Sequence, residues 1–154
     1  MIIGLGIAAG CALGALTALM GVVAMAFPGR PRPWPAHLLR RSAWLAAASA
    51  AAVYSLGLSG VLAAEWAVGD GADSTPAPAC RDGFAPATVQ GLSHHRASYL
   101  PLGFDCVRED GSTYTSDPDY AWMNRTSAVL ALSAAALAVG AGCAAELRAR
   151  AAAR

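Results

Sequence analysis

Three long stretches without a formally charged side chain constrain the fold of this chain more than any other feature. They cover residues 1–27, 42–64 and 126–145. A helix needs about 20 apolar residues to cross a bilayer, because each residue adds about 1.5 Å to its length. All three stretches reach that length. The sequence therefore predicts an all-α membrane fold, a bundle of three transmembrane helices.

The composition agrees with a membrane protein and argues against a nucleic-acid partner. Hydrophobic residues make up 56% of the 154 residues and charged residues make up 14%, whereas roughly a quarter of the residues in a soluble domain are charged. The formal net charge of +1 provides no basic field that would recruit nucleic acid. The lipid bilayer is the partner that this composition predicts.

A secretory signal peptide is the alternative for the first stretch, because Ala24-Met25-Ala26 resembles a small-x-small cleavage site. However, residues 1–4 contain no basic side chain, and the apolar run exceeds the ~7–15 residues of a signal-peptide core. We therefore expect residues 1–27 to be retained as a membrane helix. Cleavage after residue 26 stays open as the alternative.

The arginines, which supply all 11 basic residues of the chain, predict the orientation of the spans. Four of them and no acidic residue lie in the Pro-rich segment 28–41, and three more lie in residues 148–154. Short arginine-rich segments stay in the cytoplasm. We therefore predict a multi-pass protein of the plasma membrane, with its N-terminus outside and its C-terminus in the cytoplasm.

This orientation divides the chain into alternating helices and loops. The extracytoplasmic loop contains nine acidic residues and four arginines. Trp44 and Trp66 stand at the two ends of the second span, which agrees with the prediction because indole rings favour the membrane interfaces. The predicted segments are helix 1–27, cytoplasmic loop 28–41, helix 42–64, extracytoplasmic loop 65–125, helix 126–147 and cytoplasmic tail 148–154.

Glycines recur every four positions in the first stretch, at Gly6, Gly10 and Gly14. This spacing places them on one helix face, where their small size lets another helix approach closely. We expect packing within the bundle, and the alternative is a homo-oligomer or docking of another membrane protein. The three stretches contain no Asp, Glu, Lys, Arg or His, which disfavours a pump or a coupled transporter.

Cys80 and Cys106 both lie in the predicted extracytoplasmic loop. Two cysteines of a small domain outside the cytoplasm usually pair, and the crosslink compensates for a small core. We predict a structural disulfide between them. A redox-active pair is the alternative, although catalytic thiols typically occur as Cys-x-x-Cys, which this sequence lacks.

The same loop contains the signals of a small β-hairpin. Residues 97–107 favour an extended conformation, Asp110-Gly111 favours a turn, and residues 112–115 favour a second strand. Pro101 limits the first strand to an edge or a break, because proline has no N–H to donate. The apolar and aromatic side chains of this hairpin are candidate contacts for a partner: Tyr99, Leu100, Pro101, Phe104 and Tyr114.

Adjacent His94 and His95 are the remaining candidates for metal binding, with Asp105 or Glu109 as helpers. Neighbouring residues of a strand point to opposite faces, and no third ligand stands at a recognisable spacing. We therefore expect a solvated polar turn here, and no metal or cofactor. The phosphate-binding loop, the nucleophile elbow and the zinc-protease motif are all missing from the sequence, so we expect no enzyme.

The segment Tyr99-Leu-Pro-Leu-Gly-Phe-Asp-Cys106, followed by Asp110-Gly111, occurs in a chain that has three apolar stretches, many arginines and alanines, and no lysine. In this combination the chain resembles small integral membrane proteins of actinobacteria that carry a disulfide-containing extracytoplasmic loop. The resemblance implies a plasma-membrane location in a bacterium. It implies no reaction and brings no catalytic residues.

Our leading functional hypothesis is a non-enzymatic membrane protein that presents its disulfide-linked loop to a partner, as an accessory or interaction subunit. The partner would be another membrane or extracytoplasmic protein, or a second copy of the chain. The alternative is a small oligomeric channel or transporter component. An extracytoplasmic thiol or metal enzyme is the third hypothesis, which the missing motifs disfavour.

Overall fold

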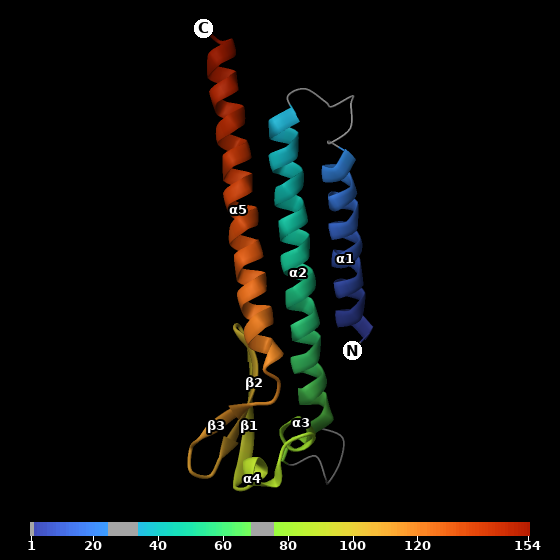
Figure 1. Ribbon diagram of the computed structural model, residues 1–154, viewed down its shortest axis with the longest axis vertical. Coiled ribbons are helices and arrows are strands. Elements are labelled where there is room, and N and C mark those ends of the chain that lie inside the picture. Colours follow the sequence, from blue (N-terminus) through green and yellow to red (C-terminus); the bar gives the residue numbers. More distant parts are fainter. Residues whose placement is uncertain (1, 25–33, 69–75) are drawn as a thin grey trace. The chain divides into compact units, whose positions relative to one another are not determined.

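The computed structural model describes residues 2–24, 34–68 and 76–154, and 70% of the chain is helical (Figure 1). The chain forms two compact units. The helical unit comprises Gly6–Val53 and Thr126–Arg154, and the loop unit comprises Met1–Leu5 and Tyr54–Arg125. The described elements are α1 (Ile2–Val23), α2 (Trp34–Val68), α3 (Pro78–Arg81), α4 (Pro86–Val89), β1 (Leu92–Tyr99), β2 (Leu102–Arg108), β3 (Thr113–Thr115) and α5 (Asp119–Ala152).

Among the described residues, two helical segments are long and apolar enough to cross a membrane, Pro35–Val68 in α2 and the whole of α5. Both contain a predicted span and extend beyond it. α2 begins at Trp34, so the part of the predicted cytoplasmic loop that is described is helical. Pro35 is compatible with this start, because the first N–H groups of a helix have no intrahelical partner. The remainder of that loop up to residue 33 lies outside the described residues.

In the helical unit, α1 lies antiparallel to α2 (Figure 1). The two helices face each other at Gly14, where a Cβ would stand 3.9 Å from the Cβ of Ala48. Arg41 of α2 donates a hydrogen bond of 2.6 Å from Nη1 to the carbonyl of Gly21. That carbonyl belongs to the last turn of α1, where carbonyls lack intrahelical partners and the helix dipole favours a cation. Arg41 therefore caps the end of α1.

Small side chains separate α2 from α5 in the helical unit. A groove of about 540 Å³ runs between the two helices. Its walls are lined mainly by alanines, with one tryptophan and one arginine: Arg40, Ala43, Trp44, Ala47, Ala134, Ala135, Ala138 and Ala141. Alanine methyl groups are too short to fill such a space, so the packing of these helices is incomplete within the chain itself.

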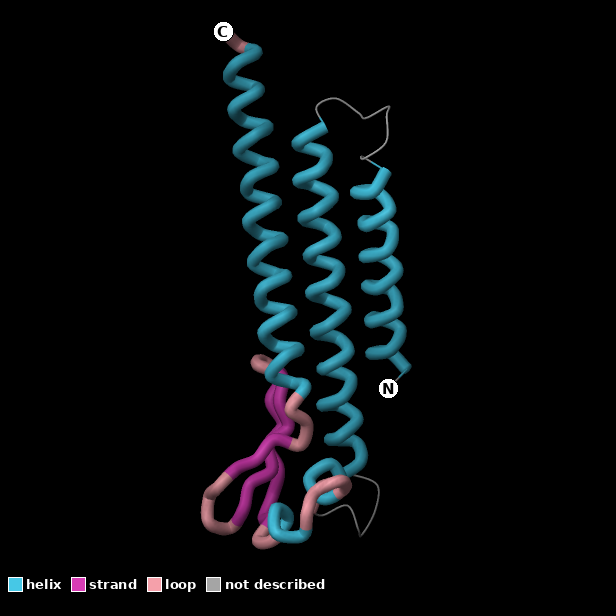
Figure 2. The backbone as a smooth tube through the Cα atoms, in the orientation of Figure 1, coloured by secondary structure: helices cyan, strands magenta, loops and turns pink. Residues whose placement is uncertain are grey.

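The loop unit contains a three-stranded antiparallel sheet in the order β1-β2-β3 (Figure 2). The predicted hairpin around Asp110-Gly111 is confirmed, because Arg108 and Ser112 close the turn with a backbone hydrogen bond of 2.9 Å. Gly111 adopts φ +81°, a left-handed conformation that glycine accepts without steric cost. Pro101 breaks the extended segment, as predicted, and the chain reverses there between β1 and β2.

Alternate residues of β2 form the core of the loop unit. Leu102, Phe104 and Cys106 are buried, while the residues between them are partly exposed. This period of two is the pattern of a strand with one covered face. The core is completed by residues from α2, α3 and α5 and from the segment before α3: Val61, Ala77, Cys80 and Tyr120.

Gly57 permits close packing between α2 and the sheet. A Cβ at this position would stand only 2.7 Å from Cδ1 of Leu102 and 2.9 Å from Sδ of Met123. One helical turn later, a Cβ at Gly60 would stand 3.2 Å from the hydroxyl of Tyr120. Gly57 and Gly60, both in the second predicted span, therefore allow the sheet and the start of α5 to pack closely against α2.

Candidate functional site

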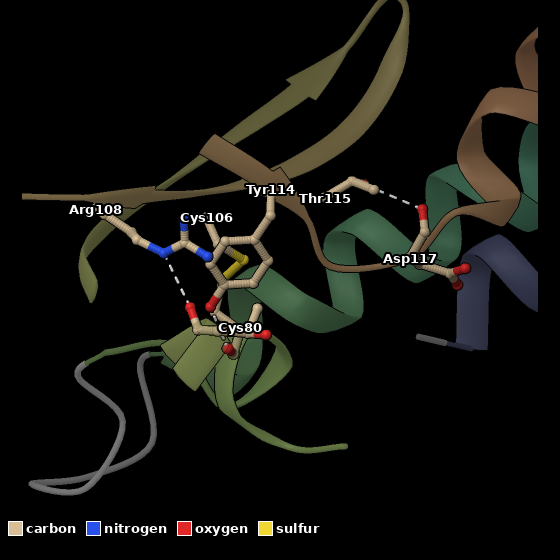
Figure 3. Close-up of a disulfide and its surroundings, with 7 residues drawn as sticks. Cys80, Cys106, Arg108, Tyr114, Thr115 and Asp117 are labelled. Atoms are coloured by element: carbon tan, nitrogen blue, oxygen red, sulfur yellow. Dashed lines mark hydrogen bonds between the residues drawn. A yellow bond between two sulfur atoms is a disulfide. The ribbon is translucent and has the colours of Figure 1, made fainter. Parts of the chain in front are cut away.

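The disulfide forms the centre of the loop unit (Figure 3). Cys80 of α3 and Cys106 of β2 lie at disulfide distance, with Cα atoms 5.8 Å apart. Both residues are fully buried. The crosslink thus joins a short helix of four residues to the central strand, across 26 positions of sequence. So short a helix has little stability of its own, and the disulfide fixes its position.

Tyr114 of β3 covers the disulfide. Its hydroxyl donates a hydrogen bond of 2.6 Å to the carbonyl of Cys80. Phe84 contacts the Tyr114 ring edge-on at 5.1 Å, and the Arg108 guanidinium lies 5.0 Å from the ring centroid. Burial raises the pKa of the Tyr114 phenol, and the nearby Arg108 charge acts in the opposite direction. Tyr114 therefore remains a neutral hydrogen-bond donor at physiological pH.

The burial of this disulfide bears on the redox hypothesis. Thiol–disulfide exchange requires a thiolate to reach one of the two sulfur atoms. Cys80 and Cys106 are both 0% exposed, and the Tyr114 ring lies over them. Cys143 is exposed and free, but it belongs to the helical unit. The geometry of Cys80 and Cys106 favours a structural crosslink over a redox-active pair.

The two candidate metal ligands lie in β1, not in the solvated turn that we expected. His95 stacks on the buried Phe104 ring, with centroids 5.0 Å apart and an angle of 6° between the planes. His94 is exposed and pairs in register with Val107, while His95 pairs with Cys106. Within residues 2–24, 34–68 and 76–154, no group of three His, Cys, Asp or Glu residues could hold a metal ion.

A shallow hollow of about 400 Å³ lies at the end of the sheet that carries the turn between β2 and β3. Arg108, Glu109 and Asp110 contribute its charged groups. Hydrogen bonds from Ser112, first from its hydroxyl and then from its backbone, lower the pKa of Asp110. Arg108 donates from Nε to the carbonyl of Thr88 at 3.0 Å. The Asp110 carboxylate and the Arg108 guanidinium therefore stabilise the turn, and their hydrogen bonds do not suit them to proton transfer.

The structure separates the five predicted contact residues into two groups. Leu100 is 84% exposed, Tyr99 is 44% exposed, and Pro101 is also exposed. Phe104 is fully buried, and Tyr114 is half-buried against the disulfide, so these two residues belong to the interior of the loop unit. The alternation of Leu102, Phe104 and Cys106 was the sequence signal that could have placed Phe104 in the core.

The three exposed residues and the buried Leu102 form the tip of the β1–β2 hairpin, Tyr99–Leu102, which side chains from two helices hold in place. Tyr54 of α2 donates a hydrogen bond of 2.5 Å to the carbonyl of Tyr99, and the Tyr99 hydroxyl bonds to Glu65. Asn124 of α5 bonds both the N–H and the carbonyl of Leu102, at 2.8 Å each. Sequence reasoning missed these roles, since no local pattern connects residues so far apart in the chain.

The opposite face of the sheet is open. Its exposed side chains come from β1 and β3, and one ion pair lies among them, between Arg96 and Asp105 at 3.2 Å. The register places these residues on the same side, because Arg96 pairs with Asp105 and Asp105 pairs with Thr115. The exposed members of this open sheet face are His94, Arg96, Thr113 and Thr115.

The three glycines of the predicted packing face differ in their surroundings. Gly14 faces Ala48, as described above. Around Gly6 and Gly10, no described atom of another segment lies within 4 Å of the position of a Cβ. Gly21, which sequence reasoning did not single out, instead contacts Arg41, whose Nη1 would stand 2.9 Å from a Cβ there. Contacts with α2 therefore involve the later glycines of α1.

No known protein family, curated protein or solved structure matches this chain. The candidate site is accordingly defined by its own geometry. It consists of a disulfide-linked core, an exposed apolar hairpin tip and an open polar sheet face, all in the loop unit.

Proposed function

We propose that this chain is a non-enzymatic, multi-pass protein of a bacterial plasma membrane that presents the loop unit outside the cytoplasm as an accessory or interaction subunit. In this proposal the membrane contains three spans: α1, residues 42–64 of α2 and residues 126–147 of α5. Residues 65–125 lie outside, and the arginines of residues 28–41 and 148–154 lie in the cytoplasm.

The observation that carries the proposal is the exposure of apolar side chains along α5. Leu132 is 72% exposed, Val139 is 66% exposed, and only 6% of the most apolar stretch of α5 is buried. A core helix of a soluble protein would bury such side chains, because apolar area in contact with water costs ~25 cal/mol per Å². Lipid removes that cost.

Outside the membrane, the open sheet face is the surface that the proposal assigns to a protein partner. It is polar and carries the Arg96–Asp105 pair, as expected for a non-obligate interface. The other face of the sheet is occupied by the core around Phe104. A disulfide in this unit agrees with an oxidising compartment.

Labelling of single cysteines in intact cells tests the topology. In a background with Cys11→Ala and Cys143→Ala, we expect a membrane-impermeant maleimide to label Glu109→Cys before lysis, and Ala152→Cys after lysis only. The two positions are both exposed, so they form a matched pair. Labelling of Ala152→Cys in intact cells, or protection of Glu109→Cys, would contradict the proposed topology and indicate the opposite orientation.

Position-specific photo-crosslinking tests the partner. A photoreactive residue at Thr113, on the open sheet face, should give one discrete adduct in cells. The same residue at Ala87, which is exposed in α4 and off that face, should give none. Identical adducts at both positions, or no adduct at Thr113, would contradict a specific partner on this face.

A small oligomeric channel or transporter component is the second candidate, and the open space beside Gly6 and Gly10 favours it. Helices that present small residues associate closely in lipid. This candidate predicts a defined oligomer in mild detergent and ion flux in liposomes, both reduced by Gly10→Leu. Stoichiometric copurification with a larger membrane protein, without flux, would instead support the accessory subunit.

A further inference from the structure

The hairpin tip, Tyr99–Leu102, is an apolar protrusion at one end of the sheet. Leu100 is 84% exposed, the largest exposure among the large hydrophobic side chains that the structure describes. Pro101 beside it is exposed as well. The turn at the other end of the sheet carries Glu109 and Asp110. The two ends of the same sheet thus differ sharply in polarity.

The helices of the loop unit locate the tip relative to the predicted spans. Leu102 bonds to Asn124, which precedes the predicted start of the third span at Thr126 by only two residues. On α2, the tip contacts Tyr54 and Gly57, which lie inside the predicted span 42–64. Both helices therefore place the tip at the outer boundary of the bilayer or deeper.

Four polar backbone groups of the tip have side-chain hydrogen-bond partners. The carbonyl of Tyr99 accepts from Tyr54, and both polar groups of Leu102 bond to Asn124. The carbonyl of Pro101 accepts from the Ser98 hydroxyl at 2.7 Å, and proline has no N–H to satisfy. Such partners lower the cost of moving this non-helical backbone from water to the membrane interface, because lipid offers no hydrogen bonds.

We propose that the hairpin tip rests in the outer leaflet of the bilayer, with Leu100 and Pro101 in contact with acyl chains and Tyr99 at the level of the headgroups. The inference rests on the proposed function, since it requires that α2 and α5 span the membrane. Tyrosine suits the interface because its ring is apolar and its hydroxyl is polar. The loop unit would thereby have a fixed orientation on the membrane surface.

One consequence concerns α2. If the tip marks the outer leaflet, the helix beyond Gly57 leaves the membrane and continues as part of the loop unit. Val61 is fully buried in the core of that unit, which agrees with a protein environment at this point. The outer end of the second span would then lie near Gly57 rather than at Ala64.

Fluorescence quenching in nanodiscs of phosphatidylcholine and phosphatidylglycerol tests the inference. An environment-sensitive fluorophore is attached to Leu100→Cys, Glu109→Cys or Leu132→Cys, each in the Cys11→Ala and Cys143→Ala background. Glu109 is the matched control at the other end of the sheet, and Leu132 reports on the predicted third span. Quenchers are iodide in water and spin-labelled lipids with a shallow or a deep label. An intact Cys80–Cys106 disulfide verifies the fold of each variant.

We expect the probe at position 100 to be quenched by the shallow lipid label and to show several-fold weaker iodide quenching than the probe at position 109. The probe at position 132 should respond to the deep label. Equal iodide quenching at positions 100 and 109, with position 132 still quenched by lipid, would overturn the inference alone and leave the tip available to a protein partner. Iodide quenching at position 132 would overturn the proposed function itself.

Discussion

The loop unit buries Phe104, Cys80 and Cys106 completely, whereas the helical unit leaves Leu132 and Val139 about two-thirds exposed. The loop unit is held by a disulfide and by side-chain hydrogen bonds to distant backbone groups. The described contacts of the helical unit are few, such as the Arg41 cap on α1. The loop unit has a buried core of its own, whereas the stability of the helical unit depends on the solvent around it, which we infer to be lipid.

Truncation of Phe104 should have the largest effect and should affect the loop unit alone. Phe104→Ala removes a fully buried ring and leaves a cavity, so we expect a loss of about 3–5 kcal/mol in unfolding free energy. Near-UV circular dichroism during thermal unfolding in micelles measures it. The matched control is Leu100→Ala, whose side chain is 84% exposed and should change stability by less than about 0.5 kcal/mol. Equal losses would contradict the assigned core.

Removal of the disulfide should come next. Closing a loop across 26 positions restricts the unfolded chain and contributes about 3 kcal/mol. Cys80→Ser and Cys106→Ser should each lower the stability of the loop unit by a similar amount, and the double variant should be no worse. Cys143→Ser, at an exposed free thiol, serves as the control. Additive losses in the double variant would argue against a shared bond.

Asn124 joins the hairpin tip to α5 through two hydrogen bonds. Asn124→Ala leaves the N–H and the carbonyl of Leu102 without these partners, and we expect a loss of about 2 kcal/mol. We expect this loss of stability to appear as faster proteolysis and faster amide hydrogen exchange at the hairpin tip. Asn124→Asp retains an acceptor for the N–H only and should have an intermediate effect. If both variants match the wild type, the side chain does not hold the tip.

These contacts show what could be predicted from the sequence and what could not. The turn at Asp110-Gly111 was predictable because glycine there accepts a left-handed backbone. The apolar helices were predictable from the length of their charge-free runs. The first part of β1, residues 92–96, was missed because Ser93, His94 and Arg96 make it polar, and its pairing with β2 is a non-local feature.

The roles of Tyr54 and Asn124 could not be derived from local patterns. The Tyr54 hydroxyl donates to the hairpin, at a carbonyl 45 positions away. Asn124 is 22 positions from Leu102. Such contacts depend on the fold that brings distant segments together. The burial of Phe104 was encoded in the alternation along β2, but the aromatic ring also fitted a surface contact.

Gly57 in the loop unit and Gly140 in the helical unit should respond in opposite directions to an added methyl group. Gly57→Ala should destabilise the loop unit by about 1 kcal/mol, because a Cβ would stand 2.7 Å from Cδ1 of Leu102, which must move. Gly140→Ala meets no described atom within 4 Å and should raise helix stability by roughly 0.5–1 kcal/mol. Thermal unfolding of the two variants side by side measures the difference. Equal changes in unfolding temperature for the two variants would contradict the difference in packing between the two units.

The smallest expected effect is that of pH on the turn between β2 and β3. Hydrogen bonds from Ser112 lower the pKa of Asp110 in the folded state. This stabilisation is therefore present above the unfolded pKa, about 3.9, and is lost as the pH falls through the lower folded value. Asp110→Asn cannot titrate, so its stability should decline slightly less than that of the wild type on acidification. If the stability of Asp110→Asn and that of the wild type depend on pH in the same way, the Asp110 carboxylate does not stabilise the turn.

The most direct test of the central claim is a peptide mass spectrum of the protein purified from membranes and alkylated without reduction. We expect a linked peptide that contains Cys80 and Cys106, together with alkylated Cys143, because the loop unit is proposed to fold outside the cytoplasm. Alkylation of both Cys80 and Cys106 would contradict it, since the loop unit would then lack its crosslink and the proposed orientation its oxidising compartment.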